Sequence, residues 1–224
     1  MQPPDEYLKV HQKRFDLSLK WLEPYIKGAR VLELGGSSQF QYMAARAGAA
    51  VTFATVGDLR KPIDDLNYWV GENWDVVLCM EVIEHIADTD GLHTEWQGDG
   101  VAMMLSEAYR MLKPGGILFL TTPNAASITA ICHALRLAPP MLYRPHVREY
   151  APSELDEIVR AAGFEIIHRE TYDVWLNSIS PGQHQYISDF IYRAGYPMEL
   201  RGEDIFLLAR RPILGMTNEA PKQG

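Results

Sequence analysis

An apolar run that ends in two glycines and is followed by a helical segment constrains the fold of this chain more than any other stretch. The run is VLELGG at residues 31–36, and two serines follow it. Glycine permits a backbone turn with positive φ and lets a ligand approach the main chain closely. A helix that begins at such a turn presents unpaired N–H groups at its N-terminus. The pattern therefore predicts a buried strand, a tight turn and a nucleotide-type cofactor site.

Strand-like and helix-like segments alternate along the chain, which predicts an α/β fold with a doubly wound, mostly parallel sheet. One helix–strand unit is expected to be reduced, because residues 57–74 are too few for a full repeat. The expected strands cover residues 30–34, 50–56, 75–80, 117–122, 164–175 and 204–210. The expected helices cover residues 5–27, 39–48, 101–112, 125–138 and 154–162, with Ser153 as the N-cap of the last one.

The size and charge of the chain argue against several classes of protein. Its 224 residues fit one domain with embellishments, and its net charge of −8 argues against nucleic acid as a partner. No apolar run approaches the ~20 residues that span a bilayer, so no membrane span is expected. Cys79 and Cys132 show neither a metal spacing nor a disulfide framework, and the N-terminus lacks the pattern of a signal peptide. We therefore expect a cytoplasmic protein.

Four motifs, in this order, resemble those of the class I S-adenosylmethionine-dependent methyltransferases. They are VLELGGSS at 31–38, WDVVLCMEVIEH at 74–85, AYRMLKPGGILFLTTPN at 108–124 and REYAPSELDEIVRAAGFEII at 148–167. The resemblance implies a Rossmann-like fold of the class I methyltransferase type, S-adenosylmethionine as the cofactor, and methyl transfer as the activity. The glycine motif by itself would also fit a dinucleotide-binding dehydrogenase, which stays open as an alternative.

The same resemblance implies which residues hold the cofactor. Glu33 and the backbone of Gly35 and Gly36 are expected to hold its methionine and ribose end. Two features depart from the family pattern: serine and glutamine replace the third motif glycine, and the acidic residue at the end of the second strand is absent. Asp58 is the candidate for the ribose hydroxyls, with a solvated turn aspartate as the alternative. The full expected set is Glu33, Gly35, Gly36, Ser37, Gln39, Asp58 and Met80.

Two carboxylates and an imidazole follow the third expected strand, where Glu81, Glu84 and His85 can converge just beyond the strand end. With His146 in a later loop, this E-x-x-E-H pattern resembles the metal site of small-RNA 2′-O-methyltransferases, and a related pattern occurs in ubiquinone-pathway O-methyltransferases. The resemblance implies that Glu81, Glu84, His85 and His146 bind Mg²⁺ or Mn²⁺, which positions a hydroxyl and lowers its pKa. Two alternatives stay open: His85 or His146 as a metal-free general base, and purely structural roles. Glu81, His85 and His146 are the candidate catalytic residues.

The leading hypothesis is an O-methyltransferase that acts on a sugar or oligosaccharide hydroxyl, because a metal can chelate vicinal oxygens. Trp69, Trp96, Tyr143 and Tyr186 are candidates for stacking on the acceptor ring, with core packing as the alternative. The stretches WLEPYIKGARVLELGGSSQF and EWQGDG are similar to the small methyltransferases of actinobacterial polysaccharide synthesis. Three further functions stay open: a metal-independent methyltransferase of phenols or quinols, an RNA 2′-O-methyltransferase and a non-catalytic binding module.

The segments outside the four motifs are assigned by their position. The expected parts are a helical cap at 1–29, a methyltransferase domain at 30–211 with an acceptor-side segment at 124–150, and a disordered tail at 212–224. The aromatic insertion at 176–202 is expected to form either a homodimer interface or a lid. In the cap, His11 and Arg14 share a helix face. That face is either solvated or covers the cofactor cleft with Arg14 toward it.

Overall fold

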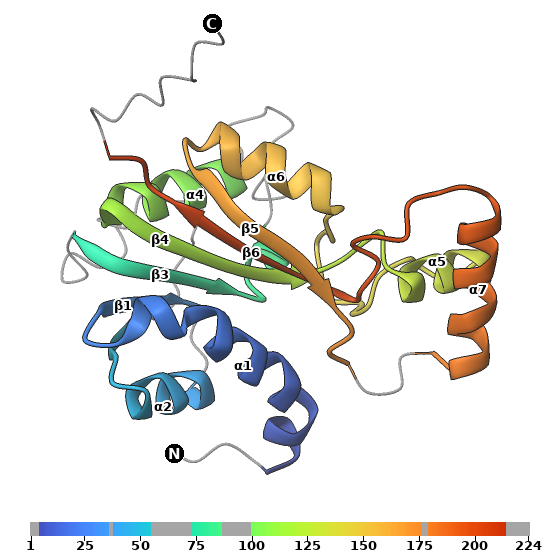
Figure 1. Cartoon of the computed structure of the whole chain (residues 1–224), viewed down its shortest axis with the longest axis horizontal. Coiled ribbons are helices and arrows are strands. Elements are labelled where there is room, and N and C mark those ends of the chain that lie inside the picture. The colour runs from blue at the N-terminus through green and yellow to red at the C-terminus, as the bar shows by residue number, and fades with distance from the viewer. Residues whose placement is uncertain (1–4, 36–37, 55–72, 87–99, 176–178, 214–224) are drawn as a thin grey trace, which may run out of the picture.

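The computed structural model describes residues 5–35, 38–54, 73–86, 100–175 and 179–213. These residues form a six-stranded sheet in the order β2-β1-β3-β4-β6-β5, with helices on both faces (Figure 1). The strands are β1 Arg30–Leu34, β2 Ala50–Ala54, β3 Trp74–Met80, β4 Leu112–Pro123, β5 Glu165–Tyr172 and β6 Asp204–Arg210. The first four strands in the chain pair in parallel, whereas β6 is antiparallel to both β4 and β5. The predicted α/β fold class is confirmed.

The helices lie close to the predicted segments, except α7, where no helix was predicted. They are α1 Asp5–Ile26, α2 Ser38–Arg46, α4 Gly100–Met111, α5 Ile128–Leu135, α6 Pro152–Ala161 and α7 Pro181–Arg193, with a short 3₁₀ turn η1 Ile83–His85. The prediction of Ser153 as an N-cap is wrong. Helix α6 begins one residue earlier, at Pro152, and its N-cap is Ala151. Proline fits the first helical position because its φ is already helical and it has no N–H that needs a partner.

Strand β4 is longer than expected, because it begins at Leu112 rather than at residue 117. The glycines that suggested a loop are paired with the chain after β6: the N–H of Gly115 donates to the Arg211 carbonyl, and the N–H of Arg211 donates to the Gly116 carbonyl. A Cβ atom on Gly116 would lie 2.9 Å from the Lys113 carbonyl oxygen. Glycine therefore allows close backbone approach here.

Each face of the sheet has its own hydrophobic core. Alternate residues of a strand point to opposite faces, so Val77 and Cys79 of β3 pack toward α4 and α6, whereas Val76 and Leu78 pack toward α1 and α2. Figure 1 shows these two helix pairs on opposite sides of the sheet. Burial on both faces explains why the central strands read as continuous apolar runs.

Helices α5 and α7 pack against each other beyond the end of β4, away from the two main cores (Figure 1). Their small cluster contains Ile128, Cys132, Ile187 and Ile191. Asn124 ties this part to the sheet, because its Nδ2 donates to the carbonyls of Leu200 at 3.0 Å and Gly202 at 2.7 Å. Helix α7 lies within the predicted 176–202 insertion.

Some of the predictions concern residues that lie outside the described ones. The reduced helix–strand unit was predicted within 57–74, and of these residues the structure describes 73 and 74. Trp69, Trp96 and the tail from residue 214 also lie outside the described residues. None of the helices within the described ranges is long and apolar enough to cross a bilayer.

Candidate active site

The carboxyl ends of β1, β3 and β4 meet at one edge of the sheet, which is where ligands bind in open α/β sheets. Gly35 follows β1, Glu81 follows β3, and Pro123 is the last residue of β4. The ladder continues past β3, because the N–H of Glu81 donates to the Thr121 carbonyl at 2.9 Å. Residues that are distant in the sequence therefore reach this edge together.

The predicted cofactor residues begin at the end of β1. Gly35 has φ of +79°, and a Cβ atom there would lie 2.5 Å from Cγ2 of Val82, so this position requires glycine. Glu33 is buried in β1 and Met80 is buried at the end of β3. Gln39 lies in the first turn of α2. Gly36, Ser37 and Asp58 lie outside the described residues.

Glu81 turns the chain sharply at the end of β3. Its φ is +55°, a left-handed conformation that is uncommon for a residue with a side chain. Its Oε1 accepts a hydrogen bond from Thr121 Oγ1 at 2.8 Å and lies 3.4 Å from Nη1 of Arg14. Residues held in this conformation cluster at functional sites. The backbone geometry thus supports a special role for this position.

Arg14 reaches the site from α1. It is only 4% exposed, and its guanidinium lies 5.5 Å from the ring centre of Trp175. Nη2 of Arg14 contacts Nδ1 of His11 at 3.4 Å. Burial and the charge of Arg14 lower the pKa of His11 to about 4, so this imidazole is neutral at pH 7. Of the two alternatives for α1, the structure supports the one in which Arg14 faces the cleft.

Glu84 is completely buried on η1. Its Oε2 accepts a hydrogen bond from Thr122 Oγ1 at 2.9 Å, whereas its Oε1 has no hydrogen-bond partner among the described residues. Burial and the nearby charge of Glu81 raise the pKa of Glu84 to about 9. An orphaned carboxylate oxygen in this position would be satisfied by a cation.

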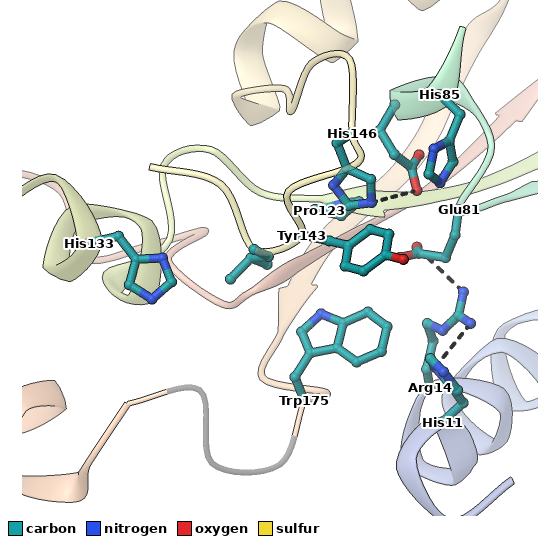
Figure 2. A pocket seen from close by; sticks show the side chains of 11 residues that line it. His11, Arg14, Glu81, His85, Pro123, His133, Tyr143, His146 and Trp175 are labelled. Atoms are coloured by element: carbon teal, nitrogen blue, oxygen red, sulfur yellow. Dashed lines mark hydrogen bonds and ion pairs between the residues drawn. The ribbon is translucent and has the colours of Figure 1, made fainter. Parts of the chain in front are cut away.

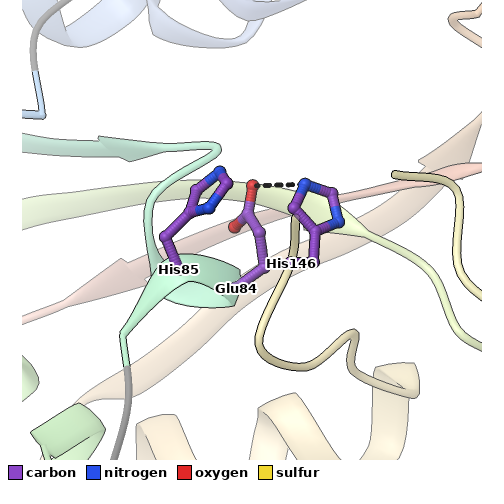
Figure 3. Close-up of side chains that lie close together, drawn as sticks. All are labelled: Glu84, His85 and His146. Atoms are coloured by element: carbon purple, nitrogen blue, oxygen red, sulfur yellow. Dashed lines mark ion pairs between the residues drawn. The ribbon is translucent and has the colours of Figure 1, made fainter. Parts of the chain in front are cut away.

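The imidazoles of His85 and His146 flank that orphaned oxygen (Figure 3). Glu84, His85 and His146 each present one ligand atom, and these atoms all lie within 4.8 Å of one another. Nε2 of His146 is 4.0 Å from Oε1 of Glu84. Two imidazoles and one carboxylate form a donor set that suits divalent metals such as Mn²⁺, Co²⁺ or Zn²⁺. The residues therefore fit a metal ion.

Glu81 was expected to be the fourth metal ligand. It is close in sequence to Glu84 and His85, but Thr121 and Arg14 engage its carboxylate instead. Another acidic residue, Asp204 at the start of β6, is fully buried nearby. Burial and then the charge of Glu81 raise the pKa of Asp204 well above its usual value. The sequence analysis offered Arg14 facing the cleft as one alternative, but it did not pair Arg14 with Glu81, and it did not single out Asp204.

A cavity of about 640 Å³ opens in front of these residues (Figure 2). Its lining consists of His11, Arg14, Glu81, Glu84, His85, Pro123, His133, Leu142, Tyr143, His146 and Trp175. Tyr143 was a predicted wall residue, whereas Trp175 was not predicted. Tyr186, also predicted, lies on α7 and is 73% exposed. The backbone N–H of Trp175 donates to Oε2 of Glu203 at 3.0 Å, which holds this residue in place.

Comparison with known proteins identifies the family. A family model described as a methyltransferase domain matches residues 9–169, which is more than half of the chain. The chain belongs to the class I methyltransferase family. The matched region of this methyltransferase includes β1, β3, β4 and the loop that carries His146, so the resemblance inferred from the four motifs is confirmed.

Curated relatives of this methyltransferase include ubiquinone biosynthesis O-methyltransferases. The one from Agrobacterium fabrum is 29% identical over 169 residues, which cover 64% of this chain and 62% of the relative. The one from Rhizobium rhizogenes is 28% identical over 189 residues, which cover 73% of this chain and 71% of the relative. The chain thus spans less than two thirds of the length of the first of these relatives.

Solved structures show that the methyltransferase has the Rossmann-like fold of its family. An S-adenosylmethionine-dependent methyltransferase from Archaeoglobus fulgidus superposes with a TM-score of 0.59 at 18% identity, covering 92% of this chain and all of that chain. The magnesium protoporphyrin IX methyltransferase from Synechocystis, solved with bound S-adenosylhomocysteine, superposes with a TM-score of 0.57 at 16% identity. It covers 94% of this chain and 89% of that one.

Proposed function

We propose that this protein is an S-adenosylmethionine-dependent O-methyltransferase that acts on a sugar or oligosaccharide hydroxyl with the help of a divalent metal. The observation that carries the proposal is the convergence of Glu84, His85 and His146 on one cavity at the carboxyl edge of the sheet. That edge is also where the glycine turn after β1 lies. A cofactor methyl group and an acceptor hydroxyl would therefore meet at this place.

The cofactor assignment rests on family membership and on the turn after β1. Gly35 gives this turn its positive φ, and Val82 fills the space where a side chain would begin. Glu33 supplies a buried carboxylate in the same strand. The Synechocystis relative was solved with S-adenosylhomocysteine, the product left after methyl transfer. The methyl group of the cofactor is already electrophilic, so the protein needs mainly to align the acceptor oxygen and remove its proton.

In the metal-dependent mechanism, Glu84, His85 and His146 would hold the ion. Mg²⁺ and Mn²⁺ are the candidates, and the two imidazoles favour Mn²⁺, because Mg²⁺ prefers oxygen ligands. A divalent ion supplies Lewis acidity, which orients a hydroxyl group and lowers its pKa. The orphaned Oε1 of Glu84 supports this assignment, because a buried carboxylate oxygen without a partner is costly. Glu81 stays beside the ion site, held by Arg14 and Thr121, where its negative charge adds to the attraction for a cation.

The proposal of a sugar acceptor rests on the cavity. Its volume lies within the ~300–1,000 Å³ that is usual for small-molecule sites. Tyr143 and Trp175 supply aromatic faces in its lining (Figure 2), and such faces stack on apolar ring surfaces. Histidine and arginine side chains supply hydrogen-bond donors between them. The resemblance to the small methyltransferases of polysaccharide synthesis supports the same acceptor class.

A second candidate function is a metal-independent O-methyltransferase of a phenolic or other small molecule. In that case His85 or His146 removes the proton from the hydroxyl as a general base. Burial and the neighbouring His146 lower the pKa of His85, which favours the neutral imidazole that such a base requires. The ubiquinone biosynthesis relatives are named as O-methyltransferases, which favours a hydroxyl acceptor in either case.

The first experiment measures thermal unfolding of the full chain with S-adenosylhomocysteine. We expect saturating S-adenosylhomocysteine to raise Tm by about 5 °C or more, and no shift would contradict the cofactor assignment. A second series adds EDTA, Mg²⁺ or Mn²⁺ to the wild type and to Glu84→Gln. The metals should raise Tm of the wild type but not of Glu84→Gln. His184→Gln, on the exposed side of α7, is the matched control and should respond like the wild type.

Activity assays with S-adenosylmethionine then separate the two candidate functions. A monosaccharide, a mannose oligosaccharide and a catechol serve as acceptors, each with and without EDTA. Loss of turnover in EDTA and its recovery with Mn²⁺ support the metal-dependent sugar methyltransferase. Turnover of the catechol that persists in EDTA and disappears in His146→Ala supports the metal-independent alternative.

A further inference from the structure

Glu149 is a buried carboxylate that neither the sequence motifs nor the family resemblance singled out. We infer that Glu149 is a positioning residue: it holds His146 in the tautomer in which Nδ1 carries the proton and Nε2 keeps its lone pair, directed at Glu84. The inference rests on the proposed function, because it adds a residue to the same site. Its geometric part, the tautomer of His146, is measurable without any turnover.

The contact between the two side chains is short and buried. Oε1 of Glu149 lies 2.7 Å from Nδ1 of His146, and the two side chains are 1% and 6% exposed. A distance of 2.7 Å between nitrogen and oxygen is that of a strong hydrogen bond. The bond therefore contains one hydrogen, which belongs either to the carboxyl group or to the imidazole.

The backbone decides which group carries that hydrogen. Oε1 of Glu149 also accepts hydrogen bonds from the N–H of Leu142 at 2.7 Å and the N–H of Tyr143 at 3.3 Å. An oxygen that already accepts from two backbone donors has no room for a proton of its own on that side. The hydrogen in the contact therefore comes from Nδ1 of His146, and in the neutral form of this imidazole the lone pair lies on Nε2.

Nε2 of His146, the ring nitrogen that does not contact Glu149, faces Glu84 and His85. Nε2 of His146 is 4.0 Å from Oε1 of Glu84, and the rings of His146 and His85 are 4.8 Å apart at an angle of 77° (Figure 3). Both roles proposed for His146, metal ligand and general base, need a lone pair at this nitrogen. Carboxylates that orient an imidazole through its other nitrogen serve such histidines widely.

The backbone is held on both sides of Glu149. The N–H of Val147 donates to the carbonyl of Glu84 at 2.9 Å, which links the loop to η1. Tyr150, directly after Glu149, accepts from the N–H of Ala125 at 3.0 Å and bridges to Asn124. Glu149 is therefore fixed by backbone contacts that do not depend on its own side chain. Glu149→Gln keeps a side-chain oxygen for the N–H groups of Leu142 and Tyr143 and should leave the loop in place, whereas Glu149→Ala also removes these two bonds.

The test uses the full-length protein with ¹⁵N-labelled histidine, and NMR of the ring nitrogens reads the tautomer. His146→Gln identifies the signal of His146. In the metal-free wild type we expect Nδ1 to be protonated and Nε2 to be bare. A wild-type His146 with its proton on Nε2 overturns the inference, and this result needs no variant at Glu149.

Variants at Glu149 test whether this residue sets the tautomer of His146. Glu149→Gln keeps an oxygen that can accept from Nδ1 and should preserve the tautomer, whereas Glu149→Ala should lose it. In Glu149→Ala the affinity for Mn²⁺, measured without cofactor, should fall by about 10- to 100-fold. Glu157→Gln, on the exposed face of α6, is the control and should leave both readouts unchanged. An unaltered tautomer in Glu149→Ala overturns the inference.

The inference and the proposed function can fail separately. Binding of S-adenosylhomocysteine should be the same in the wild type and in all the Glu149 variants, because Glu149 does not face the cofactor turn. If the tautomer is as inferred but the wild type binds no metal and methylates no hydroxyl, the proposed function fails and the positioning of His146 by Glu149 stands.

Discussion

Nη1 of Arg14 lies 3.4 Å from Oε1 of Glu81, so the first helix is tied to the residue that follows β3. The contact is shielded, with exposed fractions of 4% for Arg14 and 16% for Glu81. It joins the helix that covers one face of the sheet to the acidic side of the cavity. Loss of the guanidinium would leave Glu81 beside Asp204, another buried carboxyl.

Arg14→Met should therefore destabilise the protein by about 3 kcal/mol, because removal of one partner of a shielded ion pair leaves an uncompensated charge. Urea denaturation measures the change. Lys13→Met removes a charge from the exposed side of the same helix and should change stability by less than about 0.5 kcal/mol. In the double variant with Glu81→Gln, the penalty should shrink by at least about 1 kcal/mol. Additive penalties would contradict a direct coupling.

The turn after β1 predicts a contrast between two glycines. Gly28 and Gly35 both have positive φ. A Cβ atom at Gly28 would meet none of the described residues within 4 Å, whereas one at Gly35 would lie 2.5 Å from Cγ2 of Val82. Gly28→Ala should cost about 1 kcal/mol from the backbone alone and leave the affinity for S-adenosylhomocysteine unchanged. Gly35→Ala adds the clash and should weaken that affinity by about tenfold or more. Calorimetric titration compares the two, and equal affinities would argue against a cofactor at this turn.

The pKa of Glu84 predicts how stability depends on pH. Its pKa in the folded protein is about 9, against an ordinary value of 4.5, so the folded state holds the proton more tightly than the unfolded state. This contribution to stability is full below about pH 4.5 and is lost as the pH rises toward 9. Unfolding in EDTA between pH 5 and 8 should show the wild type losing about 1 kcal/mol per pH unit relative to Glu84→Gln. A constant difference between the two proteins would be inconsistent with a proton on Glu84.

The hydrogen bonds of the Asn124 side chain are expected to hold α5 and α7 to the sheet. Besides its two donated bonds, its Oδ1 accepts from the N–H of Ala126 at 2.9 Å, and the side chain is fully buried. Asn124→Ala should lower the free energy of unfolding by about 3 kcal/mol, because three bonds to the backbone are lost. Gln185→Ala, which removes an exposed bond to Asp189, is the control and should change it by less than about 0.5 kcal/mol. If Asn124→Ala also changed the free energy of unfolding by less than about 0.5 kcal/mol, contacts other than those of Asn124 would hold α5 and α7 to the sheet.

The strands were predictable because local composition determines them. A strand buried on both faces must be apolar throughout, and Val76 to Met80 meet that condition. The start of β4 was not predictable in this way. Its glycines resemble a turn, and they join the strand only because Arg211 comes back from the other end of the chain to pair with them.

In the candidate site, too, the residues that are close in sequence were predictable, whereas those brought together by tertiary contacts were not. Glu84 and His85 are neighbours in the chain, so their spacing sufficed to predict that they lie together. Spacing could not reveal that Glu81 is held by Arg14, since that contact depends on how α1 packs on the sheet. Trp175 and Glu149 were missed for the same reason. Trp175 belongs to no motif, and nothing in the fourth motif marks Glu149 as special. Each acquires its place through contacts with distant parts of the chain or with loop backbone.

The loop from Leu142 to Glu149 contains both an imidazole and the carboxylate that contacts its far nitrogen. The loop is therefore a compact unit: within eight consecutive residues the backbone orients the acid, and the acid orients the base. Grafted onto a methyltransferase of the same fold that has a carboxylate after its corresponding strand, it would carry a correctly oriented histidine with it, and acceptor chemistry could change while the cofactor edge of the sheet stays as it is.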